Sequence, residues 1–461
     1  MIGRNGNGMH SEGGSRMLDT VIRGGRVLGH AGARATCIGV SEGKIVSLAD
    51  ELAGQRIIDA DGLWILPGVI DGHTHMEAPA FGMLSRDTFE TGTIAAAAGG
   101  VTTVVDFTVG DRDTSLAEQI ASRRRAARHS AVDYAFHAEI VGWRPGRAEE
   151  VLQAVDQGTT SFKFYMVYDE RSDHAELLDA FRAIAAAGGV AMVHAEDHEI
   201  VEASRAAVLT WEPSTMADFG RSRPAISESL AIEVICHLAA QTGVRVHIAH
   251  VSTAGGCDVI RRAKARGIDI TAETCPHYLL LDQAAYGRPD GRQFAVVPPL
   301  RTEEDREALW AALEDGTLDM IATDHCPFLV RDKRKPEHVL DVPCGLPGVE
   351  TLLPLVHSEG VVRRGLSMEW LVSHLSSNPA QRFGLAPAKG QIAVGADADL
   401  VLFAPEKNWT AAAASLHMAT DFSPYEGLEL RGAVHATLLR GQVIWSDGRY
   451  RGQPGGGRFV S

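Results

Sequence analysis

The sequence predicts an α/β protein with a (β/α)8 TIM-like barrel and a small β-sandwich domain formed by its N- and C-terminal segments. From residue 68 to about 387, apolar strand-like runs alternate with Ala-rich helical segments. About eight such runs over roughly 320 residues are typical of a barrel with insertions. Short β-like runs separated by Gly turns flank this region on both sides, as in a small sheet or sandwich. We therefore divide the chain into a disordered leader (1–16), a β-sandwich domain (17–67 plus 388–461) and a barrel (68–387).

Composition limits the cellular setting and the partners. The first 16 residues are rich in Gly, Ser and Asn and lack the apolar stretch of a signal peptide. The formal net charge of −15 argues against nucleic acid and acidic membrane surfaces as partners. The six cysteines are scattered, without a CxxC pair, which favours reduced thiols in a cytoplasmic protein. No apolar run reaches membrane-spanning length.

Both ends of the chain predict short strands. The N-terminal runs alternate apolar and polar residues between Gly turns, and the same pattern returns after Pro387. The expected N-terminal strands are 20–27, 35–40 and 45–48. The expected C-terminal strands are 390–392, 398–403 and 436–444. Two β-rich ends that flank a barrel can complete one sandwich, so we expect them to form the second domain jointly.

Between these ends, apolar runs predict the barrel strands, and amphipathic or Ala-rich runs predict its helices. The expected strands after the first are 100–107, 134–141, 161–165, 190–194, 244–250, 268–274 and 320–324. The expected helices include 114–129, 175–187 and 227–241. The first barrel strand follows the apolar run 63–67 and contains the motif discussed next.

The segment Gly72-His73-Thr74-His75 closes this first strand. Residues i and i+2 of a strand face the same side, so His73 and His75 project together from its end. Two converging imidazoles are half of a metal site. An isolated His-x-His pair is a metal site about as often as it is a loop cap and a core histidine. The interpretation therefore depends on whether the rest of the chain supplies further metal ligands.

Several other predicted strands end in a residue that can bind a metal. The C-terminal ends of barrel strands meet at the face where chemistry occurs. Lys163 is unusual because a strand interior seldom contains a buried ammonium group. A neutral buried amine is reactive, and condensation with CO₂ would give a carbamate with two oxygens to bridge two cations. Six candidate ligands at predicted strand ends together favour a metal centre over a group of unrelated core histidines. They are His73, His75, Lys163, His194, His250 and Asp324.

At these residues the sequence resembles the dihydropyrimidinase/hydantoinase group of the cyclic amidohydrolases, in the amidohydrolase superfamily. The resemblance runs from about residue 18 to residue 460, nearly the whole chain. The motifs that carry it are Gly72-His73-Thr74-His75-Met76, Phe162-Lys163-Phe164-Tyr165-Met166-Val167-Tyr168, Val193-His194-Ala195-Glu196, Glu273-Thr274-Cys275-Pro276-His277, Pro298-Pro299-Leu300-Arg301 and Thr323-Asp324-His325-Cys326-Pro327-Phe328. These motifs are specific as a set.

The resemblance implies a binuclear centre of two divalent metal ions, usually Zn²⁺, with an N6-carboxylated Lys163. Two cations and a hydroxide between them would polarise the substrate carbonyl. The implied ligands are His73, His75 and Asp324 for the more buried metal, His194 and His250 for the second, and Lys163 as the bridge.

The resemblance also assigns catalytic and substrate-binding residues. Asp324 would take the proton of the hydroxide and deliver it to the leaving ring nitrogen. Tyr168 would stabilise the oxyanion, unless it is a rim aromatic. His325 is expected to support the site rather than to bind metal. Val297 and Cys344 are expected to contact substrate, although Val297 replaces a common Ser and Cys344 stands where dihydropyrimidinases carry Asn.

The activity that the resemblance implies is metal-dependent hydrolysis of a cyclic amide or ureide. A hydantoin or 5,6-dihydropyrimidine ring would be opened to an N-carbamoyl amino acid by a metal-bridging hydroxide. Allantoinase is the alternative, because segment 343–351 looks more like allantoinases, L-hydantoinases and dihydroorotases. A dihydroorotase-like enzyme or a non-catalytic scaffold is less favoured, since all six ligand positions are present. The family further implies a homotetramer or homodimer.

Glu77 bears on the charge of the substrate. In dihydroorotases the residue two after the second His of this motif is an Arg that binds the substrate carboxylate, a task that suits a bidentate guanidinium. Glu77 holds that position here, so we expect acidic rings to be repelled and neutral rings to be accepted. The alternative is that Glu77 lies in solvent.

Overall fold

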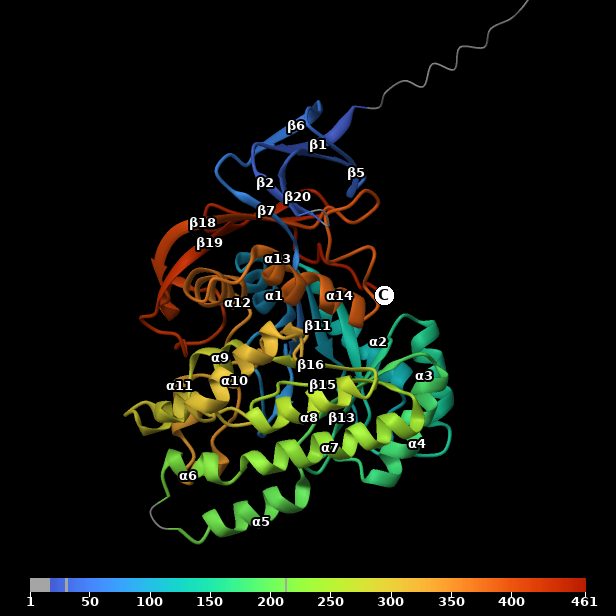
Figure 1. The fold of residues 1–461 in the computed structure, drawn as a ribbon, viewed down its shortest axis with the longest axis vertical. Coiled ribbons are helices and arrows are strands. Elements are labelled where there is room, and N and C mark those ends of the chain that lie inside the picture. Colours follow the sequence, from blue (N-terminus) through green and yellow to red (C-terminus); the bar gives the residue numbers. More distant parts are fainter. Residues whose placement is uncertain (1–16, 30–31, 212–213) are drawn as a thin grey trace, which may run out of the picture.

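A parallel eight-stranded sheet forms the centre of the molecule in the computed structural model, which describes residues 17–29, 32–211 and 214–461 (Figure 1). Its strands pair in sequence order from β8 to β17, and a parallel bridge between Thr74 and His325 joins the two ends. The strands are β8 Val69–Thr74, β11 Val101–Phe107, β12 Asp133–Glu139, β13 Ser161–Tyr165, β14 Val190–His194, β15 Arg245–Ile248, β16 Ile270–Thr274 and β17 Met320–Ile321. The predicted barrel is confirmed. The predicted leader, residues 1–16, lies outside the described residues.

Helices surround this barrel (Figure 1). Several begin at a residue whose side chain caps the free N–H groups of the first turn, and these caps are Thr88, Ser115, Asp173 and Thr302. The longer helices are α1 Phe89–Ala98, α2 Leu116–Ala126, α3 Arg147–Asp156, α4 His174–Ala186, α5 His198–Val208, α6 Met216–Arg221, α7 Ala225–Thr242, α8 Ala254–Ala265 and α10 Glu303–Glu314. The shorter ones are α9 Pro276–Leu280, α11 Val330–Arg334, α12 Leu352–Val356, α13 Met368–Val372 and α14 Asn378–Arg382. No helix in the described ranges is both long and apolar enough to cross a membrane.

Strands from the two ends of the chain lie side by side above the barrel (Figure 1). One sheet has the order β21-β20-β19-β18-β7-β2-β3, and the other has the order β5-β4-β1-β6. The N-terminal strands are β1 Leu18–Arg23, β2 Arg26–Gly29, β3 Gly32–Ala35, β4 Cys37–Ser41, β5 Lys44–Ala49, β6 Gly54–Asp59 and β7 Trp64–Pro67. The C-terminal strands are β18 Leu400–Thr410, β19 Glu429–Leu439, β20 Gln442–Ser446 and β21 Arg449–Tyr450. Apolar residues from both ends share one core, among them Ile22, Ile65, Leu400 and Leu438.

Three of the expected strands differ from the structure. The expected strand 20–27 is divided into β1 and β2, which lie in different sheets, and Gly24 between them has a left-handed φ of 86°. Residues 390–392 are not in a strand. The expected strand 436–444 is split into β19 and β20, because Arg440 and Gly441 adopt left-handed backbone angles with φ of 47° and 73° and turn the chain back on itself. The expected domain boundaries, at 67/68 and 387/388, stay a prediction. The last residues return to the barrel, where Phe459 pairs with Tyr134 of β12.

Candidate metal centre and substrate cavity

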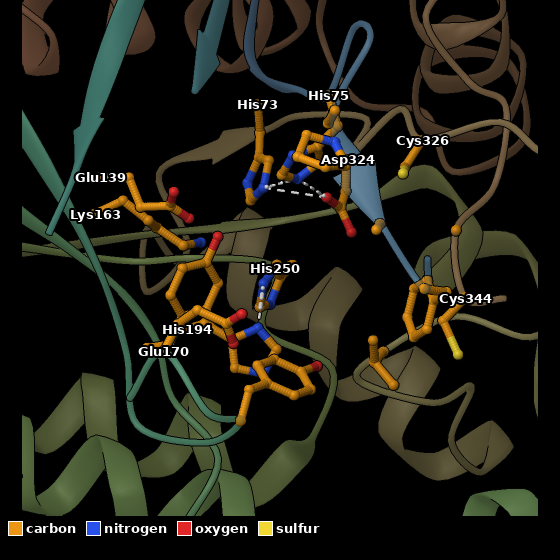
Figure 2. Close-up of a pocket in the computed structure, with 18 of the residues that line it drawn as sticks. His73, His75, Glu139, Lys163, Glu170, His194, His250, Asp324, Cys326 and Cys344 are labelled. Atoms are coloured by element: carbon orange, nitrogen blue, oxygen red, sulfur yellow. Dashed lines mark hydrogen bonds and ion pairs between the residues drawn. The ribbon is translucent and has the colours of Figure 1, made fainter. Parts of the chain in front are cut away.

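Three side chains converge where the barrel closes. His73 is on β8, His75 follows its end, and Asp324 comes three residues after β17. The Nε2 atoms of the two histidines are 3.2 Å apart, and Oδ1 of Asp324 lies 3.1 Å from the first and 3.0 Å from the second (Figure 2). Imidazole nitrogens and a carboxylate oxygen that meet in this way are a donor set that Zn²⁺ accepts.

A pair of histidines lies next to this group. His194 is the last residue of β14, and His250 comes two residues after β15. Nδ1 of His194 is 3.0 Å from Nε2 of His250, and the ring centroid of His250 is 5.4 Å from that of His73. The structure thus brings all four predicted histidine ligands together, with their ring nitrogens directed into one space (Figure 2).

Lys163 reaches the same space from the middle of β13 (Figure 2). It is buried, and its Nζ lies 5.0 Å from the ring centroid of Phe107 and 5.2 Å from that of Tyr165. Burial lowers the pKa of Lys163 to about 8, so the neutral amine that reacts with CO₂ is accessible near neutral pH.

Two buried carboxylates orient the histidines from behind. Glu273 lies 2.5 Å from Nδ1 of His73 and also contacts Nε2 of His247 at 3.1 Å, while Glu196 lies 2.7 Å from Nε2 of His194. A carboxylate on one ring nitrogen fixes the tautomer and leaves the other nitrogen free for a metal. Sequence reasoning assigned no role to either glutamate, although both stand inside the quoted motifs.

His325 has both ring nitrogens engaged inside the protein. Its Nε2 lies 3.0 Å from Oδ2 of Asp87, and its Nδ1 accepts a hydrogen bond from the N–H of Gly348 at 3.1 Å. No ring nitrogen of His325 is therefore left for a metal. These contacts connect the loop after β17 to the segments that contain Asp87 and Gly348. His325 therefore supports the site, as expected, and does not act as a ligand.

Tyr168 lies beside the histidine pair. It follows β13 by three residues, and its ring centroid is 5.3 Å from that of His194. Burial raises the pKa of Tyr168 above its usual range, and the positive charge of Arg223 opposes that rise. The hydroxyl therefore stays protonated at neutral pH and is able to donate a hydrogen bond.

Three residues of this region have left-handed backbone angles. The φ values are 75° for Tyr168, 36° for His250 and 50° for Asp324. Such conformations in residues other than Gly cost roughly 1–3 kcal/mol each and gather at functional sites. In each case the unusual backbone follows the end of a barrel strand and turns the side chain toward the others.

These residues line a cavity of about 410 Å³, which has room for a small ring and a substituent. The predicted substrate contacts Val297 and Cys344 both line it. The apolar part of its wall includes Ala78, Pro79, Ala80, Phe81, Val109, Val296 and Val297. The acidic part includes Glu139 and Glu170 (Figure 2).

Glu77 is not among the residues that line the cavity, so the expectation that it faces the substrate is wrong. The backbone of Glu77 is left-handed, with a φ of 49°, and its N–H is bound to the carbonyl of Asp87. The acidic residues that line the cavity are instead Glu139, Glu170 and Asp324.

Comparisons with known proteins give matches over nearly the whole chain. The model of the amidohydrolase family matches residues 64–444. The chain is 36% identical to D-hydantoinase from Ralstonia pickettii and 35% identical to D-phenylhydantoinase from Escherichia coli, in both cases over 96% of this chain and 98% of the relative. The crystal structure of dihydropyrimidinase from Brevibacillus agri NCHU1002 superposes with a TM-score of 0.94 at 32% identity, over 96% of this chain and 98% of that chain.

Proposed function

The chain belongs to the amidohydrolase family and is a cyclic amidohydrolase, and we propose that it opens hydantoin or 5,6-dihydropyrimidine rings to N-carbamoyl amino acids. The observation that carries the proposal is the convergence of His73, His75 and Asp324 beside the His194–His250 pair in one cavity. The names of similar proteins, which refer to hydantoins and dihydropyrimidines, support the substrate class.

The proposed cofactor is a pair of divalent cations, taken to be Zn²⁺. When bound, the cations polarise the substrate carbonyl and lower the pKa of the attacking water. The imidazole and carboxylate donors of the site suit Zn²⁺. The residues that would hold the two ions are His73, His75 and Asp324, then His194 and His250, with N6-carboxylated Lys163 between them.

Asp324 is the proposed proton carrier. Its carboxylate lies at the cavity wall against His73 and His75. It would accept a proton from the attacking water and give it to the ring nitrogen as the C–N bond breaks. One proton of the attacking water is released to solvent and the other passes through Asp324 to the departing nitrogen, while the water oxygen becomes part of the new carboxylate, so atoms and charge balance.

Tyr168 is the proposed oxyanion donor. Its ring lines the cavity beside His194, and its hydroxyl would donate a hydrogen bond to the carbonyl oxygen as negative charge develops there. A donor fixed before the reaction begins needs no reorganisation at that moment.

The cavity wall supports neutral rings as substrates. Ala78, Pro79 and Phe81 give an apolar surface to a substituent, and Glu170 is unfavourable to a substrate carboxylate. An uncharged ring with an apolar group at its 5-position is therefore compatible with both the apolar and the acidic residues of the cavity wall.

A panel assay tests the proposal. The Zn²⁺-loaded protein is given hydantoin, 5-phenylhydantoin, dihydrouracil, allantoin and dihydroorotate, and ring opening is followed for each. We expect the highest kcat/KM on a hydantoin or on dihydrouracil. A preference for allantoin or dihydroorotate, or no turnover of any ring, would overturn the proposal.

We also propose a homotetramer or homodimer located in the cytoplasm. The support for an assembly is that large apolar side chains are exposed near the end of α5 and the start of α7, namely Leu209, Trp211, Ile226 and Leu230. Six free, buried cysteines support a reducing compartment. Light scattering on the purified protein gives the number of subunits, and a monomer at micromolar concentration would contradict the assembly.

A further inference from the structure

Arg223 lies between α6 and α7 and is buried against the catalytic region, with 4% of its surface exposed. Its guanidinium carbon lies 4.9 Å from the ring centroid of Tyr168, over the ring. A desolvated guanidinium over an aromatic face is attracted by the ring and restricts its orientation. No sequence pattern singles out Arg223, because Tyr168 is 55 positions away in the chain.

Arg223 is itself held on two sides. Its Nη1 forms an ion pair with Oε2 of Glu196, the carboxylate that also contacts His194 at 2.7 Å. Its carbonyl oxygen accepts a hydrogen bond from Nη1 of Arg301 at 2.5 Å, and Nε of Arg301 donates to the hydroxyl of Ser252 at 3.1 Å. The ion pair restrains the guanidinium, and the hydrogen bond from Arg301 restrains the backbone that carries it.

Tyr168 needs such support because it stands on a loop. Its backbone is left-handed, with a φ of 75°, and it lies beyond the end of β13. A hydroxyl acts as an oxyanion donor only when it is held within hydrogen-bond distance of the position where the charge develops. The face of Arg223 fixes the plane of the ring, and its charge strengthens the phenol as a donor.

We propose that Arg223 is a positioning residue that holds the Tyr168 hydroxyl toward the substrate carbonyl and strengthens the hydrogen bond which this hydroxyl donates. The inference rests on the proposed function, in which Tyr168 stabilises the oxyanion. The alternative is that Arg223 has a purely structural role and only neutralises the buried carboxylate of Glu196. The two roles differ in whether the effect of Arg223 passes through the Tyr168 hydroxyl.

A double-mutant cycle separates the two roles. Tyr168→Phe, Arg223→Lys and the double variant are loaded with Zn²⁺ and assayed for kcat and KM on hydantoin. The lysine keeps a positive charge near Glu196 but lacks the planar group that covers the ring. We expect Tyr168→Phe to lower kcat roughly 10²–10³-fold, and Arg223→Lys to lower it about tenfold with KM within about threefold.

The double variant gives the decisive result. If Arg223 acts through the hydroxyl, the double variant has the kcat of Tyr168→Phe alone, to within about threefold. If the two losses multiply, or if Arg223→Lys keeps full kcat, the inference is overturned and the role of Tyr168 stands. If Tyr168→Phe keeps full kcat, the proposed role of Tyr168 fails first, and the inference fails with it.

Arg221→Lys is the matched control. Arg221 lies two positions away and is also over an aromatic ring, at 5.8 Å from the centroid of Trp211, but its side chain is exposed and paired with Asp218. We expect its kcat to equal that of the unaltered protein. Metal content and melting temperature are measured for every variant. If Arg223→Lys does not fold, Arg223→Gln replaces it in the same double-mutant cycle, with the same criteria. The glutamine can still donate a hydrogen bond to Glu196.

Discussion

The carboxylate of Asp71 joins the two strand ends where the barrel closes, because it accepts hydrogen bonds from both the backbone N–H of Thr323, at 3.0 Å, and its hydroxyl, at 2.5 Å. Asp71 precedes His73 by two residues on β8, and Thr323 immediately precedes Asp324. Both partners are buried. This pair of hydrogen bonds therefore sets the relative position of ligands that come from opposite ends of the barrel sheet.

Asp71→Ala should weaken both the fold and the metal site. The change leaves two buried donors of Thr323 unpaired, and an unsatisfied buried group costs about 1–3 kcal/mol. Denaturant unfolding gives the loss of stability, and elemental analysis gives the loss of metal. Asp113→Ala, at an exposed position, is the control and should change neither quantity. An Asp71→Ala protein with unchanged stability and metal content would show that other contacts hold the two strand ends together where the barrel closes.

Glu273→Gln should lower metal affinity without removing a ligand. Glu273 holds Nδ1 of His73 and Nε2 of His247, and loss of such a partner typically lowers metal affinity or activity about 10–100-fold. A titration of the metal-free variant with Zn²⁺ against a competing chelator measures the change. An affinity equal to that of the unaltered protein would mean that His73 needs no fixed tautomer.

Lys163→Ala should lose turnover and most bound metal. An alanine has no nitrogen to carboxylate, and an unmodified ammonium would repel two cations. Short carboxylic acids added with Zn²⁺ should restore part of the activity by supplying oxygens at the same place. Full turnover and unchanged metal content in Lys163→Ala would contradict the bridging role.

Neutral rings should be better substrates than dihydroorotate. Among the described residues that line the cavity, Lys163 is the one lysine or arginine, and Glu170 adds a carboxylate. Burial raises the pKa of Glu139, which also lines the cavity, to about 7, so Glu139 is only partly charged near neutral pH. Like charges repel in a partly desolvated site, so we expect kcat/KM for hydantoin or dihydrouracil to be at least about ten times that for dihydroorotate. Glu170→Gln should narrow this ratio, and Glu199→Gln, on the outer helix α5, should not. Equal kcat/KM values on charged and neutral rings would show that the acidic residues of the cavity wall do not disfavour a substrate carboxylate.

The fold and the convergence of the four histidines could be predicted because they depend on local pattern. The alternation of strands and helices is visible along the chain, and the spacing of His73 and His75 places both on one side of a strand by geometry alone. His194 and Asp324 could be recognised because they follow apolar strands, whose ends meet in a barrel.

The supporting residues could not be predicted, since their partners lie far away in the sequence. Glu273 is 200 positions from His73 and Arg223 is 27 positions from Glu196, so no local period connects them. The failure at Glu77 has a related cause. The expectation for Glu77 rested on its place in the motif, two residues after His75, and that place lies beyond the end of β8 in a left-handed backbone with a φ of 49°, where the motif does not determine what the side chain faces.

Hydrolysis of a cyclic amide should depend on two metal ions bound by these side chains. A titration of the metal-depleted protein with Zn²⁺, with hydantoin or dihydrouracil ring opening followed at each step, measures this dependence. We expect negligible turnover without metal and a rise in activity that levels off at about two Zn²⁺ per chain. Full turnover by the metal-depleted protein, or metal binding that leaves the protein inactive on every cyclic amide, would show that the proposed metal centre does not catalyse this reaction.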